Sequence, residues 1–439
     1  MAGLPNILYL NSHDTGRYVQ PYGYAVPTPN IQRLADQGLL FRKAFAAAPI
    51  CSGSRASLLT GQFAHSSGML GLAHRGYRLA DPHQHIVHVL REAGYWSASI
   101  GEQHVSADPA TIGYDRNVEI DSSRARHVAP AAVELIAERA NADEPFFMSV
   151  GFFETHREFF EPSSVRDALY SLPPANVPDS PETRRDMAAF KASARSLDQG
   201  VGAVLNALDE HETEEDTLVI LTTDHGLAFP GAKATLYDRG TGVMLIMRGP
   251  GGFTGGRVLD AMVSHLDLYP TICDLSQIAH PEWLRGHSLL PLVQREAVEI
   301  NDSLFSEMTF HAAYEPQRAV RTRRYKYIRR FDNGHAGQVM PNVDDGLTKD
   351  FLVEHGWAKQ AVEPEQLFDL ILDPAEAVNL IDRPECGEVA DELRSQLDRW
   401  MIETEDPLLD GPIAPKPGTV YNKPDQISAE EPTFHAPER

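Results

Sequence analysis

Cysteine is scarce in this chain of 439 residues, which has only Cys51, Cys273 and Cys386. Three scattered cysteines are too few for a disulfide framework or for a zinc site built from thiolates. No apolar run approaches the roughly 20 residues that are needed to cross a bilayer. The chain runs from Met1 into the apolar stretch 7–10 with no basic segment and no small-residue cleavage site. We therefore expect a cytoplasmic protein that makes no membrane contact.

Basic residues are also in deficit. The chain has 39 Lys and Arg against 62 Asp and Glu, which gives a formal net charge of -23. This balance argues against a sequence-independent grip on a phosphate backbone, so an anionic substrate would need a local cationic site. With 42% hydrophobic and 23% charged residues, the composition is that of a globular protein and excludes collagen-like or wholly disordered classes.

Short apolar runs of strand length recur between helical patterns. The strands that we expect span residues 7–11, 96–100, 146–151, 217–222 and 243–247. Continuous apolar strands separated by helices are typical of sheets that are covered on both faces. We therefore predict an α/β fold with a mostly parallel central sheet flanked by helices.

Two helices are marked by their first residues. Thr28 followed by Pro29 predicts an N-cap and a proline at the first helical position. Apolar residues spaced by three and four from 187 to 208 predict a long helix over 181–208, with Ser180 as its N-cap.

The pattern changes after about residue 295. Short strands at 317–322 and 325–330 and a helix over 390–400 predict a smaller C-terminal α+β subdomain. The last 34 residues carry seven prolines and little apolar periodicity, which predicts an extended tail that lies on the surface or is disordered. We therefore divide the chain into a catalytic domain over 1–295, a subdomain over 296–405 and a tail over 406–439.

Polar residues that follow predicted strands are the first candidates for chemistry, because open parallel sheets bind ligands at the carboxyl ends of their strands. His13 and Asp14 follow the first strand, His156 follows the third, and Asp224 and His225 follow the fourth. Each group alone is explained by a helix N-cap or a hydrogen-bonded core histidine. Together, Asp14, Asp224 and His225 offer oxygen and nitrogen ligands that suit a divalent metal.

Cys51 begins a second group of candidates. It lies before a helical stretch, and Arg55 follows one turn later. The free N–H groups and the positive end of a helix dipole favour a bound anion, so this segment suits an oxyanion. Cys273 and Cys386 lack such a setting, and we expect both to be small buried side chains in the core.

Several motifs occur in a recognisable order between Asn6 and about Trp400. They are T-P-N-I-Q-R-L-A, S-R-A-S-L-L-T-G, T-D-H-G and Q-L-F-D-L-I-L-D-P-A-E-A-V-N-L. This order resembles the type I sulfatases of the alkaline phosphatase superfamily, whose hallmark is Cys-x-Pro-x-Arg before a helix, with the cysteine oxidised to formylglycine. G-L-A-F-P-G-A-K-A-T-L-Y and R-W-M-I-E-T-E-D-P are most similar to the sulfamidase (heparan N-sulfatase) branch.

The resemblance implies a metal site and a nucleophile. Asp14, Asp224 and His225 would ligate a divalent cation, usually calcium, together with an oxygen of the modified Cys51. Arg55 would orient the hydroxyls of that residue. A hydrated aldehyde is useful because one hydroxyl attacks sulfur, and deprotonation of the other then expels sulfate.

The resemblance also implies groups that face the substrate. His104 corresponds to the histidine of the family's G-K-x-H motif, beside the nucleophile. His156 and Lys233 would face the sulfate and the leaving group, where either one, when protonated, would donate to the departing oxygen or nitrogen.

Three residues depart from the family pattern. Gly53 stands where the modification signature has proline or alanine, so Cys51 could remain a thiol. His13 replaces the first aspartate of the usual pair, which favours a softer cation such as manganese. Glu102 replaces the lysine of G-K-x-H and exchanges a sulfate-binding cation for an anion near the substrate.

Other polar segments have weaker functional interpretations. His311 and Tyr314 are candidates for the lining of the substrate pocket. The basic stretch 321–327 mixes cations with tyrosines, as nucleic acid-binding segments do, but in an acidic chain a solvated strand edge is the better interpretation. Histidines at 83, 85 and 88 have helical spacing and predict a polar face.

The resemblance implies a metal-dependent hydrolase that cleaves a sulfate ester or a sulfamate on a sugar or aminosugar. One alternative keeps the metal but takes a phosphonate monoester or phosphodiester, because phosphoryl transfer uses the same clamp of metal and cations. Another is a catalytically silent relative that binds metal and a small molecule. The expected partners are the sulfated substrate and a formylglycine-generating enzyme, with no nucleic acid; self-association into a homo-oligomer is compatible with the sequence.

Overall fold

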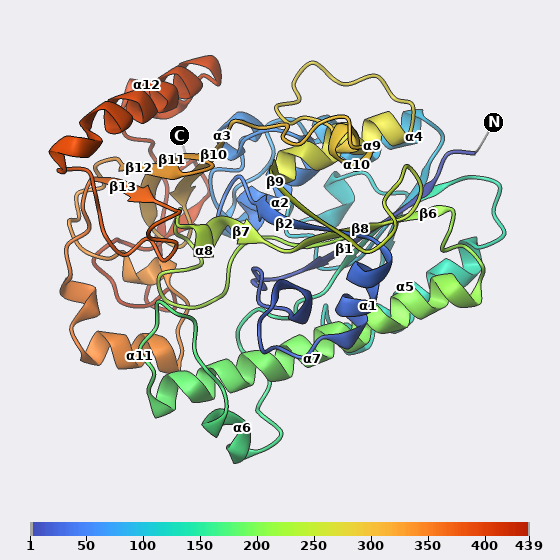
Figure 1. The fold of residues 1–439 in the computed structure, drawn as a ribbon, viewed down its shortest axis with the longest axis horizontal. Helices are drawn as coiled ribbons and strands as arrows, with labels where there is room; N and C mark the ends of the chain where they lie inside the picture. The colour runs from blue at the N-terminus through green and yellow to red at the C-terminus, as the bar shows by residue number, and fades with distance from the viewer. Residues whose placement is uncertain (1–2, 438–439) are drawn as a thin grey trace.

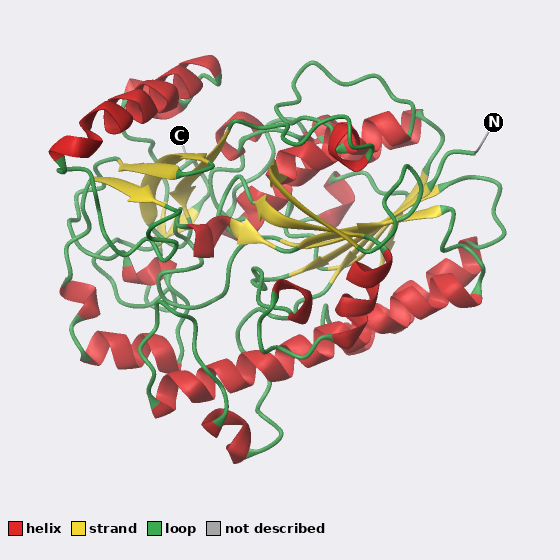
Figure 2. Cartoon of the chain, in the orientation of Figure 1, coloured by secondary structure: helices red, strands yellow, loops and turns green. Residues whose placement is uncertain are grey.

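The computed structural model describes residues 3–437, so the first two residues of the predicted catalytic domain and the last two of the predicted tail lie outside it. A nine-stranded sheet dominates the fold, and helices lie on both of its faces (Figures 1 and 2). Its spatial order is β4 (Arg116–Val118), β3 (Trp96–Gly101), β5 (Phe146–Gly151), β1 (Asn6–Ser12), β6 (Thr217–Thr223), β8 (Leu245–Arg248), β2 (Leu39–Phe45) and β7 (Gly242–Val243), and β9 (Arg257–Ser264) also pairs with β2.

Strand β1 shows why the sheet is covered twice. Ile7 and Tyr9 point into one apolar cluster, whereas Leu8 and Leu10 point into the other. Because side chains alternate along a strand, a run that is apolar at every position must be buried on both faces. The predicted α/β fold with a mostly parallel sheet is confirmed.

The two helical layers follow from these clusters. The helices of the chain are α1 (Pro29–Gln37), α2 (Cys51–Thr60), α3 (Ala64–Ser67), α4 (Ile86–Glu92), α5 (Ala125–Arg139), α6 (Val165–Leu169), α7 (Pro181–Glu210), α8 (Asp238–Thr241), α9 (Leu268–Leu275), α10 (Leu290–Val293), α11 (Leu347–Glu354) and α12 (Gly387–Glu403). Helices α1, α5 and α7 cover one face of the sheet, and α2, α4, α9 and α10 cover the other (Figure 1). Within residues 3–437, none of these helices combines the length and apolar composition that a membrane crossing requires.

The long helix α7 is confirmed, and so is its cap. The Ser180 side chain accepts from the Thr183 N–H, and the Thr183 side chain accepts in return from the Ser180 N–H. Helix α1 begins at Pro29 as predicted, but the Thr28 hydroxyl does not cap it. Instead, Asp198 on α7 accepts from the N–H groups of Asn30 and Ile31, so a neighbouring helix satisfies the free donors.

The predicted strand over 243–247 is wrong in one respect, because the structure divides it into β7 and β8. Met244 leaves the ladder, since its N–H donates to the Gly16 carbonyl. Strand β8 is antiparallel to both of its neighbours, β6 and β2. Strands β2 and β9 were not predicted; charged residues interrupt the apolar pattern of β2, and β9 is fully buried only in its second half.

A four-stranded antiparallel sheet forms the C-terminal part, in the order β10 (Ser303–Phe310), β11 (Tyr314–Thr322), β12 (Tyr325–Arg330) and β13 (Glu365–Asp369). Helix α12 packs on it through Leu393, Leu397 and Trp400. In Figure 1 this sheet lies beside one end of the large sheet, with α12 over its outer side.

The predicted solvated edge over 321–327 is wrong. Strands β11 and β12 are the two inner strands of their sheet, and Lys326 is only 1% exposed. Its ammonium lies 2.6 Å from Asp238 and 2.9 Å from Glu376. Arg321 also pairs with Asp238. These cations stabilise the junction between the two sheets through buried ion pairs.

The tail after Asp406 follows the surface as far as residue 437. It contains β14 (Val420–Tyr421) and β15 (Phe434–His435), which pair with each other. The Asn422 N–H donates to the Ala312 carbonyl, and Lys416 donates to the Gly68 carbonyl. Between residues 406 and 437 the tail therefore has regular contacts with the rest of the chain, and the alternative of disorder is wrong for this segment.

The burial predicted for individual cysteines and histidines is confirmed at some positions and wrong at others. Cys273 is buried in the core as predicted, whereas Cys386 is only half-buried. The predicted polar face of histidines is wrong for His85, which is 1% exposed and accepts from the Val87 N–H at the start of α4. His83 is exposed.

Candidate active site

The site lies where neighbouring strands end. Strands β3, β5, β1 and β6 are parallel and adjacent, so the residues that follow them reach one edge of the sheet. His13 follows β1, Asp224 follows β6, Glu102 follows β3 and His156 lies beyond β5. The residues predicted to follow separate strands, His13, His156 and Asp224, therefore lie at one edge of the sheet, and Glu102 joins them there.

Cys51 reaches the same edge through a strand that the sequence pattern did not reveal. Strand β2 is antiparallel to β8, which is antiparallel to β6, so β2 and β6 run in the same direction. The chain leaves β2 at this edge and begins α2 with Cys51. The Cys51 sulfur lies 3.3 Å from His225 Nε2.

Gly53 has a local packing role. A Cβ atom at this position would lie 2.9 Å from Cγ1 of Ile50, closer than side chains normally approach. Ser54, the next residue, donates from its hydroxyl to the Asp224 carbonyl at 2.5 Å. The first turn of α2 is therefore packed closely against Ile50, which precedes the helix, and against the loop after β6.

Two buried carboxylates form the centre of the site. Asp14 is 0% and Asp224 is 3% exposed, and the Asp14 N–H donates to Asp224 Oδ1 at 2.8 Å. His13 Nδ1 lies 3.1 Å from Asp14 Oδ1 and 3.2 Å from Asp224 Oδ2. His225 Nε2 lies 3.3 Å from Asp14 Oδ1. Asp14 adopts a positive φ of 56°, which turns its side chain toward these partners.

Arg55 lies under the carboxylates. Its guanidinium donates to Asn11 Oδ1, to the Ser12 carbonyl at 3.0 Å and to Asp224 Oδ2 at 3.3 Å. Burial opposes its charge, but Asp224 together with the other anionic groups around it raises the pKa of Arg55. Asn11 was not a sequence candidate, and only its place at the end of a strand could have indicated it.

Lys233 connects the carboxylates to a loop from the C-terminal part. Its ammonium lies 2.9 Å from Asp14 Oδ2, 3.0 Å from Asp344 Oδ2 and 3.3 Å from His156 Nε2. Burial opposes the charge of Lys233, yet Asp14 and Asp344 together raise its pKa well above the usual value. Asp344 is a second residue that the sequence reasoning missed, because 330 residues of chain separate it from Asp14.

The electrostatics separate the groups that stay charged from those that stay neutral. Burial opposes ionisation of Asp14, but the nearby Lys233 and histidines hold its pKa well below the usual value. Burial raises the pKa of the Cys51 thiol well above its ordinary value. Burial and the Lys233 charge lower the pKa of His156 to about 4.

His104 lies on the other side of Cys51. Its Nε2 is 2.8 Å from His74 Nδ1, and the two rings stack. Its Nδ1 is buried and has no hydrogen-bond partner within residues 3–437. Burial, with the nearby His13 and His74, lowers the pKa of His104 well below its usual value. His74 is a third residue that the sequence reasoning missed.

An open cavity of about 470 Å³ lies next to this group. Its lining includes His13, His74, Glu102, His104 and His156. Glu102 therefore faces the same cavity as the predicted site histidines, and its charge contributes to the raised pKa of Arg55.

His311 lies in the turn between β10 and β11. It is 7% exposed, and its Nδ1 is buried without a hydrogen-bond partner in the described part of the chain. Burial, with the charge of Lys233 nearby, lowers its pKa well below the usual value. The Tyr314 hydroxyl accepts from the Ile413 N–H and is thereby joined to the tail.

The donor set fits a divalent cation. His13, Asp14, Cys51 and Asp224 each offer a ligand atom, and these atoms all lie within 4.8 Å of one another. Two carboxylates with imidazole nitrogens form a mixed oxygen and nitrogen set. The predicted metal residues are therefore brought together, while their individual roles stay predictions.

Comparison with known proteins agrees with this geometry. Residues 5–278 match the family model described as Sulfatase, and residues 225–346 match the model described as N-sulphoglucosamine sulphohydrolase, C-terminal. The chain is 31% identical to N-sulphoglucosamine sulphohydrolase of Homo sapiens, over 93% of this chain and 92% of that protein. The chain belongs to the sulfatase family.

Solved structures show the same fold. The structure of BT4656 in complex with its substrate D-glucosamine-2-N,6-O-disulfate has a TM-score of 0.72 at 18% identity, covering 93% of this sulfatase and 99% of that chain. The putative sulfatase yidJ from Bacteroides fragilis has a TM-score of 0.75 at 19% identity, covering 94% and 100%. The predicted family and the predicted enzyme class, sulfatase, are both confirmed.

Proposed function

We propose that this sulfatase hydrolyses a sulfate ester or a sulfamate on a sugar or aminosugar, with a divalent cation and a formylglycine derived from Cys51. The observation that carries the proposal is the convergence of Cys51, two buried carboxylates and Lys233 at one edge of the sheet. The likeness to a human N-sulphoglucosamine sulphohydrolase supports an aminosugar as substrate.

The cation would be held by Asp14, Asp224 and His225, with His13 beside them. When bound, it supplies positive charge that polarises the sulfate oxygens and the nucleophile. Calcium is the ion that we propose first, because the two carboxylates are hard oxygen ligands. Manganese is the alternative, since His13 adds a nitrogen where the family has a third carboxylate.

The formylglycine would occupy the position of the Cys51 side chain at the first turn of α2. When formed, it supplies a hydrated aldehyde with two hydroxyls. One hydroxyl is the nucleophile, and deprotonation of the other lets the residue release sulfate without hydrolysis of a sulfate ester. Arg55 lies one turn further on, where its guanidinium fixes Asp224 and the end of β1. This arrangement holds the nucleophile and the metal ligands in a fixed relation.

We propose Lys233 as the proton donor to the leaving group, because it is the group that is protonated at neutral pH. Its pKa is raised well above the usual value, so it carries a proton at neutral pH. His156, by contrast, has its pKa lowered to about 4 and is neutral at pH 7. We therefore assign the donation to Lys233, and we assign to His156 a hydrogen bond to the sulfate or to Lys233.

The remaining site assignments follow from position. His104 lies next to Cys51, and its Nδ1 makes no hydrogen bond to any described residue, so it can take a proton from the modified residue. Glu102 faces the open cavity and would select against substrates of high negative charge. His311 is assigned to the leaving-group side, near Lys233.

The test begins with mass spectrometry of the peptide that contains Cys51. Protein from a host that has the formylglycine-generating enzyme should show loss of the thiol sulfur and gain of an aldehyde oxygen. The same protein should release sulfate from N-sulfoglucosamine or from a sulfated sugar, and chelation should abolish that activity. Cys51→Ser should be nearly inactive, whereas Cys386→Ser, which changes a distant thiol, should be as active as wild type.

Each alternative corresponds to a different result. A protein that cleaves phosphonate monoesters or phosphodiesters but no sulfate would contradict the proposed substrate class. A metal-binding protein with neither activity would be a silent relative. Full activity with Cys51 entirely in the thiol form would contradict the formylglycine.

The proposed setting is cytoplasmic. In addition to the sulfated substrate, the proposed partner is the formylglycine-generating enzyme, and a homo-oligomer is compatible with the proposal. Neither nucleic acid nor a membrane is part of it. Cell fractionation and light scattering of the purified protein test the location and the oligomeric state.

A further inference from the structure

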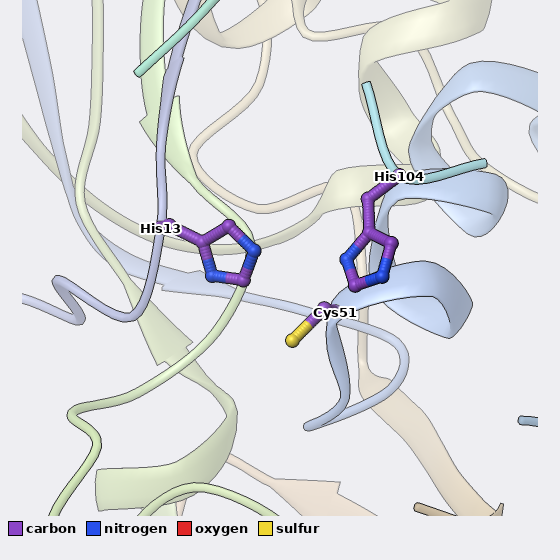
Figure 3. Close-up of side chains that lie close together, drawn as sticks. All are labelled: His13, Cys51 and His104. Atoms are coloured by element: carbon purple, nitrogen blue, oxygen red, sulfur yellow. The ribbon is translucent and has the colours of Figure 1, made fainter. Parts of the chain in front are cut away.

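His13 and His104 face each other across Cys51. Figure 3 shows a ring nitrogen of each histidine directed at the other, with the Cys51 sulfur below the gap between them. The ligand atoms of these three residues lie within 4.8 Å of one another. One thiol and two imidazoles in this arrangement are the ligand types that zinc prefers.

The other nitrogen of each imidazole already has a partner. His13 Nδ1 lies 3.1 Å from Asp14 Oδ1 and 3.2 Å from Asp224 Oδ2, so its Nδ1–H can donate to carboxylates. His104 Nε2 lies 2.8 Å from His74 Nδ1. The atoms left to face Cys51 are therefore His13 Nε2 and His104 Nδ1. Zinc-binding histidines are held in this way, with the distal N–H donated to a carboxylate or another acceptor.

The His104 Nδ1 atom is an independent sign of a missing partner. It is buried and makes no hydrogen bond within the described part of the chain. A buried polar atom without a partner costs free energy, and a bound cation would remove that cost. The carboxylates behind His13 and the Glu102 side chain in the adjoining cavity add negative charge around the three ligands.

We propose that the unconverted chain binds one zinc ion through Cys51 Sγ, His13 Nε2 and His104 Nδ1. This inference concerns the same site as the proposed function but a different chemical state, since only the thiol form of Cys51 can be a zinc ligand. Binding releases the thiol proton to solvent as the sulfur bonds to the ion. Three protein ligands leave a fourth tetrahedral position open to the cavity of about 470 Å³, which is also the entry path.

The ligand atoms must approach each other slightly for this to happen. Zinc–sulfur and zinc–nitrogen bonds of roughly 2.3 and 2.0 Å put tetrahedral ligand atoms roughly 3.3 to 3.5 Å apart. Since the ligand atoms lie within 4.8 Å of one another, each pair has to close by at most about 1.5 Å, which side-chain rotation can supply. The zinc form has no formylglycine, so it is inactive as a sulfatase. The unconverted form matters here because Gly53 stands where the modification signature has proline or alanine, so Cys51 could remain a thiol.

The experiment uses full-length protein in which mass spectrometry shows Cys51 to be a thiol. After equilibration with zinc alone and gel filtration, it should retain one zinc per chain. Cobalt as a spectroscopic probe should give a thiolate-to-metal charge-transfer band. Cys51→Ala should lose both the band and the retained zinc, whereas Cys386→Ala should keep them.

The histidines are tested separately. His104→Ala should weaken zinc binding at least tenfold, and the exposed His83→Ala should leave it unchanged. His74 contacts the His104 ring at Nε2 and does not contact a proposed ligand atom itself. His74→Ala should therefore weaken zinc binding only by leaving His104 less well oriented, by about 10- to 100-fold. Thermal melting of each variant shows whether it is folded. Because His74 lies at the surface, we expect His74→Ala to fold normally, so weaker zinc binding in that variant would not come from misfolding.

Two results would overturn the proposal. Retention of zinc by Cys51→Ala would show that the thiol is not a ligand, and unchanged affinity in both His104→Ala and His74→Ala would remove His104 from the ligand set. The proposed sulfatase activity is measured on converted protein, so either idea can fail without the other.

Discussion

The Lys233 ammonium lies 2.9 Å from Asp14 Oδ2, and both side chains are almost fully buried. The proposed proton donor therefore touches a proposed metal ligand. Each charge stabilises the other, because a buried carboxylate and a buried ammonium are both costly alone. These two buried charges are thus paired with each other inside the site.

Replacing Lys233 by methionine should affect both activity and stability. Loss of this donor is expected to lower kcat by about 10²- to 10³-fold, as for other buried groups that stabilise developing charge. Asp14 and Asp344 would then share an uncompensated negative charge, which should destabilise metal-free protein by roughly 3–5 kcal/mol. Steady-state kinetics and urea unfolding measure the two effects.

Lys423→Met serves as the control for Lys233, because Lys423 lies in the tail over the Phe434 ring. It should leave kcat unchanged. Wild-type kcat in Lys233→Met would show that Lys233 does not act on the leaving group.

Glu102→Gln should change the choice of substrate. Glu102 lines the cavity beside His104, where a carboxylate repels a dianionic phosphate monoester more than a monoanionic sulfate ester. The ratio of kcat/KM for an aryl sulfate over the matching aryl phosphate should therefore fall in Glu102→Gln, and fall further in Glu102→Lys. The exposed Glu119→Gln should not alter the ratio. An unchanged ratio in both Glu102 variants would place this side chain outside the substrate path.

His13→Asp should increase the preference of the site for calcium over manganese. His13 Nδ1 lies within 3.2 Å of both buried carboxylates, so an aspartate there would add a third hard ligand. Added calcium should then raise the melting temperature of the variant more than that of wild type, because a ligand that binds the folded state stabilises it. The control variant is His355→Asp, since His355 is exposed and directly follows α11. Calcium should affect this variant as it affects wild type. Equal calcium effects in wild type and His13→Asp would show that His13 does not approach the metal.

The stability of the protein should fall as the pH drops from about 6.5 toward 3. Burial lowers the pKa of His85 and of His265 to about 3, so both stay neutral in the folded state while the unfolded chain takes up protons. The unfolded state then binds more protons, and each such group adds a slope of up to about 1.4 kcal/mol per pH unit. This contribution is complete above the unfolded pKa near 6.5 and is lost as the pH falls through the folded value.

His85 can be isolated within this effect. Its Nδ1 accepts a hydrogen bond from the Val87 N–H, and a protonated imidazole has no nitrogen that could accept this bond. His85→Asn keeps an acceptor at the start of α4 but does not titrate, so the free energy of unfolding should depend less on pH between 4 and 6.5. The exposed His83→Asn should show the wild-type slope. Urea unfolding across this range measures both.

Sequence reasoning reached those parts of the structure that obey local rules. Helix α7 begins where Ser180 and Thr183 form a reciprocal cap, and such a cap involves residues only three apart. The apolar run of β1 required cover on both faces, and the residues after it had to lie at a strand end. The meeting of Asp14 with Asp224 followed from these two facts, because parallel neighbouring strands end at the same edge.

Only the tertiary structure decided which side chains complete the site. Asp344 reaches Lys233, and His74 reaches His104, from loops whose own sequences carry no sign of a partner. The basic stretch 321–327 is polar in the sequence, yet Lys326 is buried because Asp238 and Glu376 come to it from other segments. Such contacts join residues tens to hundreds of positions apart, and their geometry depends on how whole layers pack. Periodicity and capping act over a few residues and therefore determine the elements, whereas the packing of those elements determines the partner of each buried charge.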